Sequence, residues 1–242
     1  MRIVTVTNQK GGVGKTTLAC HLALAGVEKG RRTLLVDLDT QGNASTMLAR
    51  SAEIAHRPGG SAALFSEAAP APLATETGVD LLHGHQRLDE VDQRVALAEA
   101  AGIRERLLAL PYDLVVVDTP PALGLRHLGP QVWADVVVTP LEPNSFSLLA
   151  LSQTLAAIEE IRSLRPSLQN RILINRFNKS SGQQNRYIAA LAEHVELTTP
   201  YLTLRVAVSD ALDEGAPVWR FRRADRETRD TWKNLCGELI DG

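Results

Sequence analysis

A glycine-rich segment directly follows an apolar run near the start of the chain. Residues 10–17 read Lys-Gly-Gly-Val-Gly-Lys-Thr-Thr, and residues 3–6 read Ile-Val-Thr-Val. A strand that enters such a turn and continues as a helix points backbone N–H groups and the positive helix end at one place, where they bind phosphate oxygens. The segment therefore predicts a phosphate-binding loop in which Lys15 reaches the β- and γ-phosphates and the Thr16 hydroxyl binds Mg²⁺.

The loop departs from the ordinary phosphate-binding pattern at its first position. That pattern has glycine five positions before the final Gly-Lys-Ser/Thr, whereas this chain has Gln9 there, followed directly by Lys10. This is the deviant form of the loop, which carries two lysines. Lys15 alone is compatible with any enzyme of this kind, so Lys10 is the residue that narrows the interpretation to one class of nucleotide switch.

Two further apolar runs end in carboxylates. Asp37 and Asp39 follow the run at residues 33–36, and Asp118 ends the run at residues 114–117. Ligands bind at the carboxyl ends of parallel strands, where carboxylates hold Mg²⁺ through water or orient an attacking water. Asp118 is predicted to lie near the metal. Asp39 lies farther past its strand and is predicted to bind the metal and to orient the attacking water. Asp37 is assigned to a supporting position or a turn cap.

The apolar run at residues 172–174 ends in Asn175 and Arg176. A side-chain amide at a strand end is able to hydrogen-bond an adenine edge, although an asparagine that only shapes a turn explains the pattern equally well. We assign both residues to the nucleotide as a hypothesis. The residues assigned to ATP are Lys10, Gly11, Gly12, Val13, Gly14, Lys15, Thr16, Thr17, Asn175 and Arg176.

Strand-like runs alternate with helical patterns along the whole chain. Most strand-like runs are continuous Val/Ile/Leu stretches, as expected when both faces of a sheet are covered. This alternation predicts an α/β fold with a doubly wound, mostly parallel sheet and helices on both faces. Strands are expected at residues 2–7, 33–37, 79–82, 113–118, 134–139 and 170–175. Helices are expected at residues 15–29, 87–109, 145–164, 182–195 and 224–240, with a loop carrying short helices at 51–78.

Composition excludes several classes of protein. Hydrophobic residues make up 44% of the 242 positions and charged residues 22%, which is typical of a globular chain and not of a disordered one. A net charge of −2 gives no general affinity for nucleic acid, so any such contact needs a local patch. Cys20 and Cys236 are too few for a disulfide framework or zinc site and are predicted to be buried. No apolar run approaches the length of a membrane span and no signal peptide opens the chain, so we expect a cytoplasmic protein.

Taken together, these motifs resemble the ParA/Soj family of DNA-partitioning ATPases, within the wider ParA/MinD group. The resemblance runs nearly from end to end and rests on four segments. They are residues 7–17 (Thr-Asn-Gln-Lys-Gly-Gly-Val-Gly-Lys-Thr-Thr), 37–44 (Asp-Leu-Asp-Thr-Gln-Gly-Asn-Ala), 118–124 (Asp-Thr-Pro-Pro-Ala-Leu-Gly), and the late pair 209–211 and 215–218.

The resemblance implies an ATP-dependent sandwich dimer with two nucleotides at its interface. Lys10 then reaches the partner's nucleotide and acts, with Lys15 and Asp39, as a catalytic residue, because a cation supplied near the γ-phosphate stabilises transition-state charge. It also implies that the ATP-bound dimer binds double-stranded DNA without sequence preference. A ParB-type centromere-binding partner stimulates hydrolysis and releases the dimer, so that plasmid or chromosome DNA is segregated over the nucleoid.

The chain differs from the family pattern at two places. Thr40 stands where the family usually has proline, which frees the turn after Asp39 and bears on the placement of the attacking water. The chain also begins at the strand of the phosphate-binding loop. We therefore expect residues 1–242 to form a single P-loop ATPase domain without an N-terminal helix-turn-helix extension.

A cluster of cations lies near the C-terminus. Residues 216–233 hold six cations and three carboxylates, a local charge of +3, which fits a phosphate-backbone contact through counterion release. A solvated helix face with charge pairs four residues apart explains the same pattern. The residues assigned to DNA are Arg205, Arg220, Arg222 and Arg223.

Three other functions stay open at this stage. A ParA-like ATPase that positions a protein cargo on the nucleoid has the same enzymology and a different partner. A MinD-like protein needs a basic amphipathic membrane helix at its end, but Trp232, Leu235, Leu239 and Ile240 form a short stripe that we expect to be buried, so no membrane partner is predicted. A metabolic P-loop enzyme needs cluster-ligating cysteines or a substrate-binding insertion, and neither is evident.

Overall fold

The protein is a single sheet covered by helices, as the alternation of patterns predicts. The computed structural model describes residues 1–51, 53–54, 57, 59–66, 68–94, 100–144 and 147–242. The sheet has the strand order β3-β4-β2-β5-β1-β6-β7-β8, and only the pairing of β3 with β4 is antiparallel. The strands are β1 (Arg2–Val6), β2 (Thr33–Asp37), β3 (Leu73–Ala74), β4 (Asp80–Leu82), β5 (Leu114–Asp118), β6 (Val136–Leu141), β7 (Gln169–Ile174) and β8 (Leu197–Thr198).

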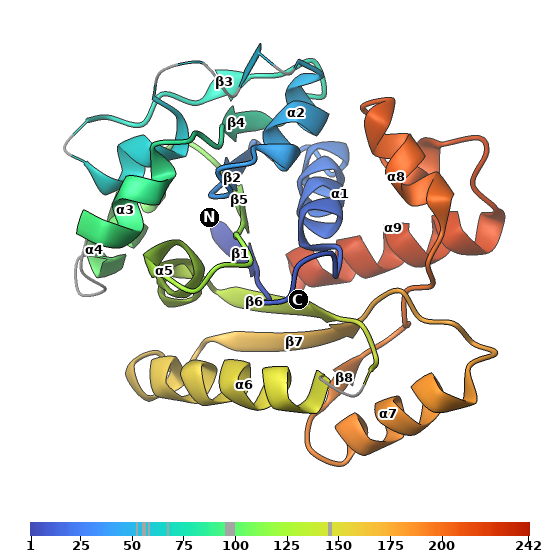
Figure 1. The fold of residues 1–242 in the computed structure, drawn as a ribbon. Coiled ribbons are helices and arrows are strands. Elements are labelled where there is room, and N and C mark those ends of the chain that lie inside the picture. Colours follow the sequence, from blue (N-terminus) through green and yellow to red (C-terminus); the bar gives the residue numbers. More distant parts are fainter. Residues whose placement is uncertain (52, 55–56, 58, 67, 95–99, 145–146) are drawn as a thin grey trace.

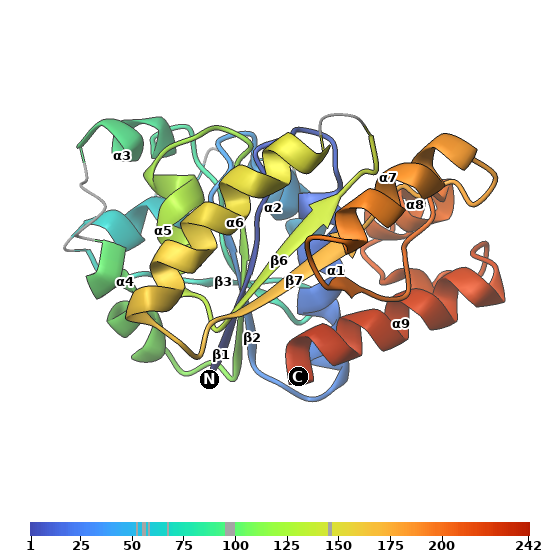
Figure 2. The same cartoon turned by 90° about the horizontal axis from the view of Figure 1, so that it is seen from below.

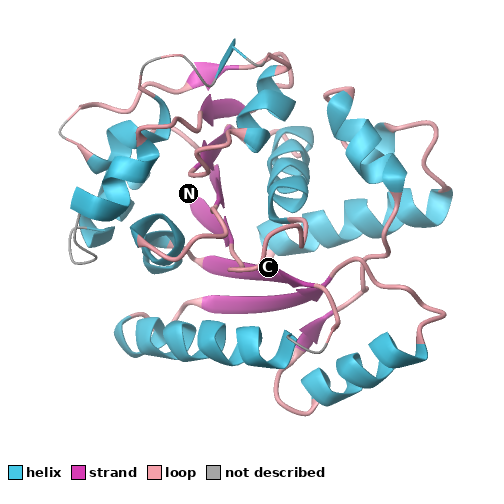
Figure 3. Cartoon of the chain, viewed as in Figure 1, coloured by secondary structure: helices cyan, strands magenta, loops and turns pink. Residues whose placement is uncertain are grey.

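Helices cover both faces of this sheet (Figure 1). The α-helices are α1 (Lys15–Glu28), α2 (Asn43–Ala49), α3 (Leu88–Arg94), α4 (Ala100–Leu108), α5 (Leu125–Trp133), α6 (Ser147–Leu164), α7 (Gly182–Ala192), α8 (Val206–Asp213) and α9 (Arg226–Asp241). Two 3₁₀ turns, η2 (Gly60–Phe65) and η4 (Val218–Arg220), complete the described elements. Figure 3 shows the strands in the centre with α1, α8 and α9 on one side and α3, α4 and α5 on the other.

Alternate residues of the central strands enter two separate cores. On β5, Leu114 and Val116 pack with α1 and α9, whereas Val115 and Val117 pack with α3, α4 and α5. On β1, Val4 enters the first core and is fully buried. Because successive side chains of a strand point to opposite faces, a continuous apolar run is what a strand covered on both sides requires. The view from below shows α6 alongside α5 and α7 beside the other end of β7 (Figure 2).

All six expected strands are confirmed, and the two-residue strands β3 and β8 were not predicted. The expected helix at 87–109 is described as α3 and α4, and the residues between them lie outside the described part of the chain, as do the first two residues of the helix expected at 145–164. The 51–78 segment contains the short η2 helix, as predicted, and also β3. Three helices, α2, α5 and α8, were not predicted, and α5 contains Pro130 in its interior.

Candidate active site

The glycine-rich loop joins β1 to α1, as predicted, and two of its glycines are required by its geometry. Gly12 and Gly14 have φ values of 74° and 93°, in the left-handed region that favours glycine. A Cβ atom on Gly14 would lie 2.4 Å from the side-chain nitrogen of Asn175. The loop therefore fits against the end of β7 only with glycine at position 14.

The two residues at the end of β7 clamp the loop from outside. The Asn175 amide donates a hydrogen bond to the Val13 carbonyl at 2.8 Å, and the Arg176 guanidinium donates to the Gly12 carbonyl at 2.6 Å. Asn175 also accepts a hydrogen bond from the Arg176 N–H at 2.9 Å through its side-chain oxygen. Both residues thus lie at the phosphate-binding loop. In this structure the Asn175 amide binds the loop backbone, and the predicted contact with an adenine edge is not tested.

Lys15, the first residue of α1, is buried inside the loop. Its side-chain amine donates to the Lys10 carbonyl at 3.2 Å, and the residue is 6% exposed. Burial lowers the pKa of Lys15, while the carboxylates of Asp118 and Asp39 oppose that shift. A buried ammonium of this kind needs nearby negative charge, which phosphate oxygens supply.

The strand register brings Asp37 and Asp118 side by side at the carboxyl edge of the sheet. Asp37 pairs with Asp118 across β2 and β5, and both are fully buried. The Asp37 carboxylate accepts three hydrogen bonds, from the Ser45 N–H (2.9 Å), the Ser45 hydroxyl (2.6 Å) and the Asp39 N–H (3.0 Å). Burial nevertheless raises the pKa of Asp37 to about 6. Asp37 therefore supports the Asp39 turn, the position that the sequence indicated for it.

Asp118 differs from Asp37 because its buried carboxylate is not satisfied. Neither oxygen has a hydrogen-bond partner of ordinary geometry among the described residues. Burial, followed by the neighbouring Asp37, raises the pKa of Asp118 well above its ordinary value, and the nearby Thr16 hydroxyl and Lys15 ammonium only partly offset this. An orphaned buried carboxylate is costly unless a cation completes it.

This arrangement fits Mg²⁺ held together with nucleotide phosphates. Thr16 and Asp118 supply a hydroxyl and a free carboxylate in the loop region, and Asp39 follows β2 on the same edge. Within the described residues no group of three or more His, Cys, Asp or Glu side chains forms a metal cage. Because Mg²⁺ usually keeps waters and binds one or two carboxylates plus substrate phosphates, such a cage is not needed.

Asp39 lies on a tight turn directly after β2. Its carboxylate accepts a hydrogen bond from the Gln41 N–H at 3.0 Å, and its carbonyl accepts one from the Gly42 N–H at 3.0 Å. A Cβ atom on Gly84 would lie 2.3 Å from the Asp39 carbonyl oxygen, so the loop after β4 is packed against this turn. These contacts hold the turn that Thr40 enters without the usual proline.

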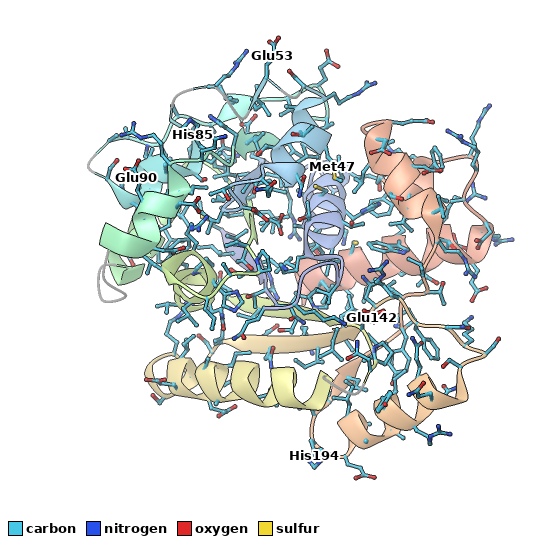
Figure 4. All side chains as sticks on the ribbon, in the orientation of Figure 1. Met47, Glu53, His85, Glu90, Glu142 and His194 are labelled. Atoms are coloured by element: carbon cyan, nitrogen blue, oxygen red, sulfur yellow. The ribbon has the colours of Figure 1, made fainter. Side chains whose placement is uncertain are left out.

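Lys10 faces outward, in contrast to Lys15. Its side chain is 43% exposed, and its amine forms an ion pair with Glu142 at 3.0 Å. Glu142 follows β6 and extends toward the loop (Figure 4). The backbone of Lys10 is fixed by the Asn8 side chain, which accepts its N–H at 2.8 Å. The amine of the second lysine is therefore held at the surface of the chain, where it is paired with Glu142.

A cleft of about 220 Å³ opens beside the loop, and part of its lining comes from residues that were not predicted to contact the nucleotide. It is bounded on one side by Thr17, Asn175 and Arg176, and its other side comes from the segment before and within α8. The lining residues that were not predicted to contact the nucleotide are Thr203, Leu204, Arg205, Val208 and Ser209, together with Trp232 of α9. Arg205, assigned above to DNA, thus borders the candidate nucleotide cleft. The unpredicted helix α8 is the reason that this wall was missed.

Three of the cations assigned to DNA are paired with carboxylates. Arg205 lies 3.7 Å from Asp225, and Arg220 lies 2.8 Å from Glu28. Arg223 pairs with Glu214 and stacks over the Phe221 ring. Arg222 is exposed and forms no ion pair within the described residues. The charge of three of these four cations is thus locally compensated.

The C-terminal apolar stripe is buried, as predicted. Trp232, Leu235, Leu239 and Ile240 belong to the core on the α1 side, and Cys236 and Cys20 are buried free thiols in the same core. Among the described helices, none has the length and apolarity that crossing a bilayer requires.

Comparison with known proteins agrees with this geometry. A family model described as an AAA domain matches residues 1–171. The chromosome partitioning protein ParA of Caulobacter vibrioides is 31% identical over 233 residues, covering 90% of this chain and 86% of the relative. The chain belongs to the ParA/Soj family of partitioning ATPases. Protein IncC of Escherichia coli is 30% identical over 247 residues, covering 95% of this chain and 67% of that protein.

The fold of this ParA/Soj-family chain is shared more widely. A cobyrinic acid a,c-diamide synthase from Mycobacterium smegmatis, solved with an ATP analogue and magnesium, superimposes with a TM-score of 0.78 at 25% identity, over 99% of this chain and 94% of that one. The P-loop NTPase fold is therefore confirmed, and family membership rests on the sequence relatives.

The unsatisfied Asp118 carboxylate gives a prediction about stability. Because its pKa is raised in the fold, the folded protein holds a proton that the unfolded chain releases, so the free energy of unfolding falls as pH rises above about 4. Asp118→Asn keeps the shape without the charge. In metal-free protein at pH 7 we expect it to raise the free energy of unfolding and to flatten its dependence on pH.

Urea denaturation at pH 5, 6 and 7, with and without Mg²⁺ and ATP, measures this effect. The wild type should gain stability from Mg²⁺ with ATP, and Asp118→Asn should gain much less. A variant that is less stable than the wild type without ligand, or equally stabilised by Mg²⁺ with ATP, contradicts the placement of the metal at Asp118.

Proposed function

We propose that this chain is an ATP-dependent partitioning ATPase that works as a nucleotide-switched homodimer. In the ATP-bound state two copies enclose two nucleotides and bind double-stranded DNA without sequence preference. Hydrolysis of ATP to ADP and phosphate, slow in the isolated protein and stimulated by a ParB-type partner, releases the dimer. The protein thereby segregates plasmid or chromosome DNA over the nucleoid, with residues 1–242 acting as one ATPase domain in the cytoplasm.

One observation carries the proposal: the two lysines of the loop differ in exposure. Lys15 is buried in its own loop, whereas the Lys10 side chain is 43% exposed and is held toward Glu142. A lysine that serves its own nucleotide belongs inside the loop. An exposed lysine on the loop rim suits a site that a second copy completes, as an arginine finger supplied in trans completes other phosphoryl-transfer sites.

The proposed roles in the site follow from the geometry of each residue. Lys15 and the loop N–H groups bind the phosphates, and the Thr16 hydroxyl and the Asp118 carboxylate hold Mg²⁺, directly or through water. Asp39 orients the attacking water and also faces the metal. Asn175 and Arg176 keep the loop in its phosphate-binding form and border the cleft for the base and ribose.

DNA binding is proposed on the surface formed by η4 and the start of α9. Arg220, Arg222 and Arg223 are exposed there, and Arg205 lies at its edge. Such a surface binds the phosphate backbone by counterion release, so its affinity falls steeply with salt. The ion pair from Glu28, the last residue of α1, to Arg220 lowers the positive charge that this surface presents.

Removal of that carboxylate tests the assignment. Glu28 accepts hydrogen bonds from the Arg220 guanidinium (2.8 Å) and the Trp219 indole N–H (2.6 Å). Glu28→Gln should free Arg220 for a phosphate, raise DNA affinity about 3–10-fold at low salt, and steepen the slope of log affinity against log salt by about one.

The matched control is Glu105→Gln on α4, an exposed residue on the opposite side of the sheet from α9 (Figure 1). It removes the same charge and should leave both the affinity and the slope unchanged. If both variants change DNA affinity equally, the effect comes from the net charge of the protein and not from Arg220. If Glu28→Gln leaves DNA binding unchanged, DNA does not bind at Arg220.

The proposed function as a whole is tested by nucleotide-dependent association. Mass and DNA binding are measured with ADP, ATP and a slowly hydrolysed ATP analogue, each at two salt concentrations. We expect a monomer that binds DNA weakly with ADP, and a dimer that binds DNA in a salt-sensitive manner with the analogue. A protein that stays monomeric with every nucleotide contradicts the proposal.

A further inference from the structure

A buried arginine reaches from α5 to the carbonyl of Leu38, the residue between Asp37 and Asp39. Arg126 is the second residue of α5, and its side chain is only 6% exposed. Its guanidinium donates to the Asp92 carboxylate and the Leu38 carbonyl, at 2.8 and 3.4 Å. A third donor contacts Asp89 at 2.9 Å. The sequence analysis did not indicate this residue.

The contact between α3 and α5 is shaped to hold this arginine. Asp92 of α3 also accepts the backbone N–H of Arg126 at 3.0 Å, so one carboxylate fixes both the helix start and the side chain. Gly124, with φ 157°, leaves the space, because a Cβ atom there would lie 2.6–2.8 Å from the Asp92 carboxyl group. A buried ion pair is stable only when its remaining hydrogen-bond capacity is used, and here the Leu38 carbonyl is the third partner of the guanidinium, beside Asp92 and Asp89.

The backbone N–H and the backbone carbonyl of Leu38 both form hydrogen bonds. Its N–H donates to the Asp118 carbonyl at 3.0 Å, and its carbonyl faces Arg126. Asp39 is the next residue, and its own N–H donates to the Asp37 carboxylate at 3.0 Å. Removal of the Arg126 contact therefore leaves the peptide that leads into Asp39 with one restraint fewer, while the phosphate-binding loop keeps all of its contacts.

We propose that Arg126 is a positioning residue for Asp39. It fixes the carbonyl of Leu38 and so holds the Asp39 carboxylate where it orients the attacking water. The proposal rests on the proposed function, because it takes the role of Asp39 from there. Arginine is required because its planar fork serves the two carboxylates and the carbonyl at once, whereas the three donors of a lysine ammonium all leave one compact nitrogen and cannot span these partners.

Arg126→Lys is the direct test, since it keeps the charge beside Asp92 and removes the fork. We expect kcat for ATP hydrolysis to fall about tenfold or more, because small misplacements of a catalytic group are costly. KM for ATP should stay within about twofold of the wild type, because phosphate binding does not pass through Arg126. The matched control is Asp89→Asn, which removes the charge of the outer, exposed partner of Arg126 and should leave kcat unchanged.

Amide hydrogen exchange provides a readout that does not depend on hydrolysis. In Arg126→Lys the amides of residues 38–42 should exchange faster, and those of the phosphate-binding loop should not. If Arg126→Lys does not fold, Asp92→Asn weakens the anchor of the arginine instead and should give the same two changes at smaller size.

The possible outcomes separate this proposal from the proposed function. Wild-type kcat and wild-type exchange at residues 38–42 in Arg126→Lys would overturn it. A loss of ATP affinity as large as the loss in kcat would also overturn it, and so would faster amide exchange throughout the protein. In either case a general structural role of Arg126 explains the slower hydrolysis. If Asp39→Ala hydrolyses ATP normally, the proposed function of Asp39 fails, whereas the exchange result still reports whether Arg126 holds the turn.

Discussion

Asp39→Ala is expected to bind ATP and dimerise like the wild type but to hydrolyse ATP about 10²–10⁴-fold more slowly. The carboxylate lies on the turn after β2, and among the described residues it accepts one hydrogen bond, from the Gln41 N–H. Loss of this group therefore removes the proposed water-orienting oxygen without disturbing the loop around Lys15. Single-turnover hydrolysis measures the rate, and a fluorescent ATP analogue measures the affinity.

A second substitution at the same position separates charge from turn shape. Asp39→Asn keeps an oxygen that accepts the Gln41 N–H, so the turn should persist. We expect it to be nearly as slow as Asp39→Ala, because an amide is a far weaker proton acceptor. If Asp39→Asn hydrolyses ATP at the wild-type rate, Asp39 shapes the turn and another group orients the water.

Lys10→Ala is expected to retain ATP binding, to lose hydrolysis by roughly 10³-fold, and to weaken ATP-dependent dimerisation without abolishing it. The lysine is on the rim of the loop, 43% exposed, and its removal leaves the buried Lys15 in place. A cation near the γ-phosphate stabilises charge that develops in the transition state, so the rate should suffer far more than the affinity.

Lys29→Ala is the matched control for this variant. Lys29 follows α1, is 40% exposed and is paired with a carboxylate, Asp241, as Lys10 is paired with Glu142. It should keep wild-type hydrolysis and dimerisation. If Lys10→Ala behaves like this control, the second lysine has no part in the reaction.

The sequence was sufficient to predict the features that depend on local pattern. The strands were recognisable because residues such as Val115, Val116 and Val117 form unbroken apolar runs, which a sheet covered on both faces requires. The loop around Lys15 and the carboxylate at Asp118 were recognisable because phosphate binding and metal binding each need particular residue types at a strand end.

The features that were missed depend on contacts between distant segments. The helix α5 was hidden because Gly124, Gly129 and Pro130 resemble helix breakers, yet Asp92 from α3 fixes its first turn. The pairing of Arg220 with Glu28 joins residues 192 positions apart. No local pattern in the sequence carries either contact, so both the compensated charge near η4 and the role proposed for Arg126 became visible only in the fold.

If a second copy of the chain completes the active site, two variants that are each inactive should regain activity when they are mixed. Lys10→Ala keeps Asp39, and Asp39→Ala keeps Lys10. If Lys10 acts on the partner's nucleotide, each mixed dimer contains one complete site. An equal mixture should then recover about a quarter of the wild-type rate, since about half of the dimers are mixed and one of their two sites is complete. If Lys10 acts within its own subunit, no site is complete, and a mixture as inactive as its two components would contradict the account.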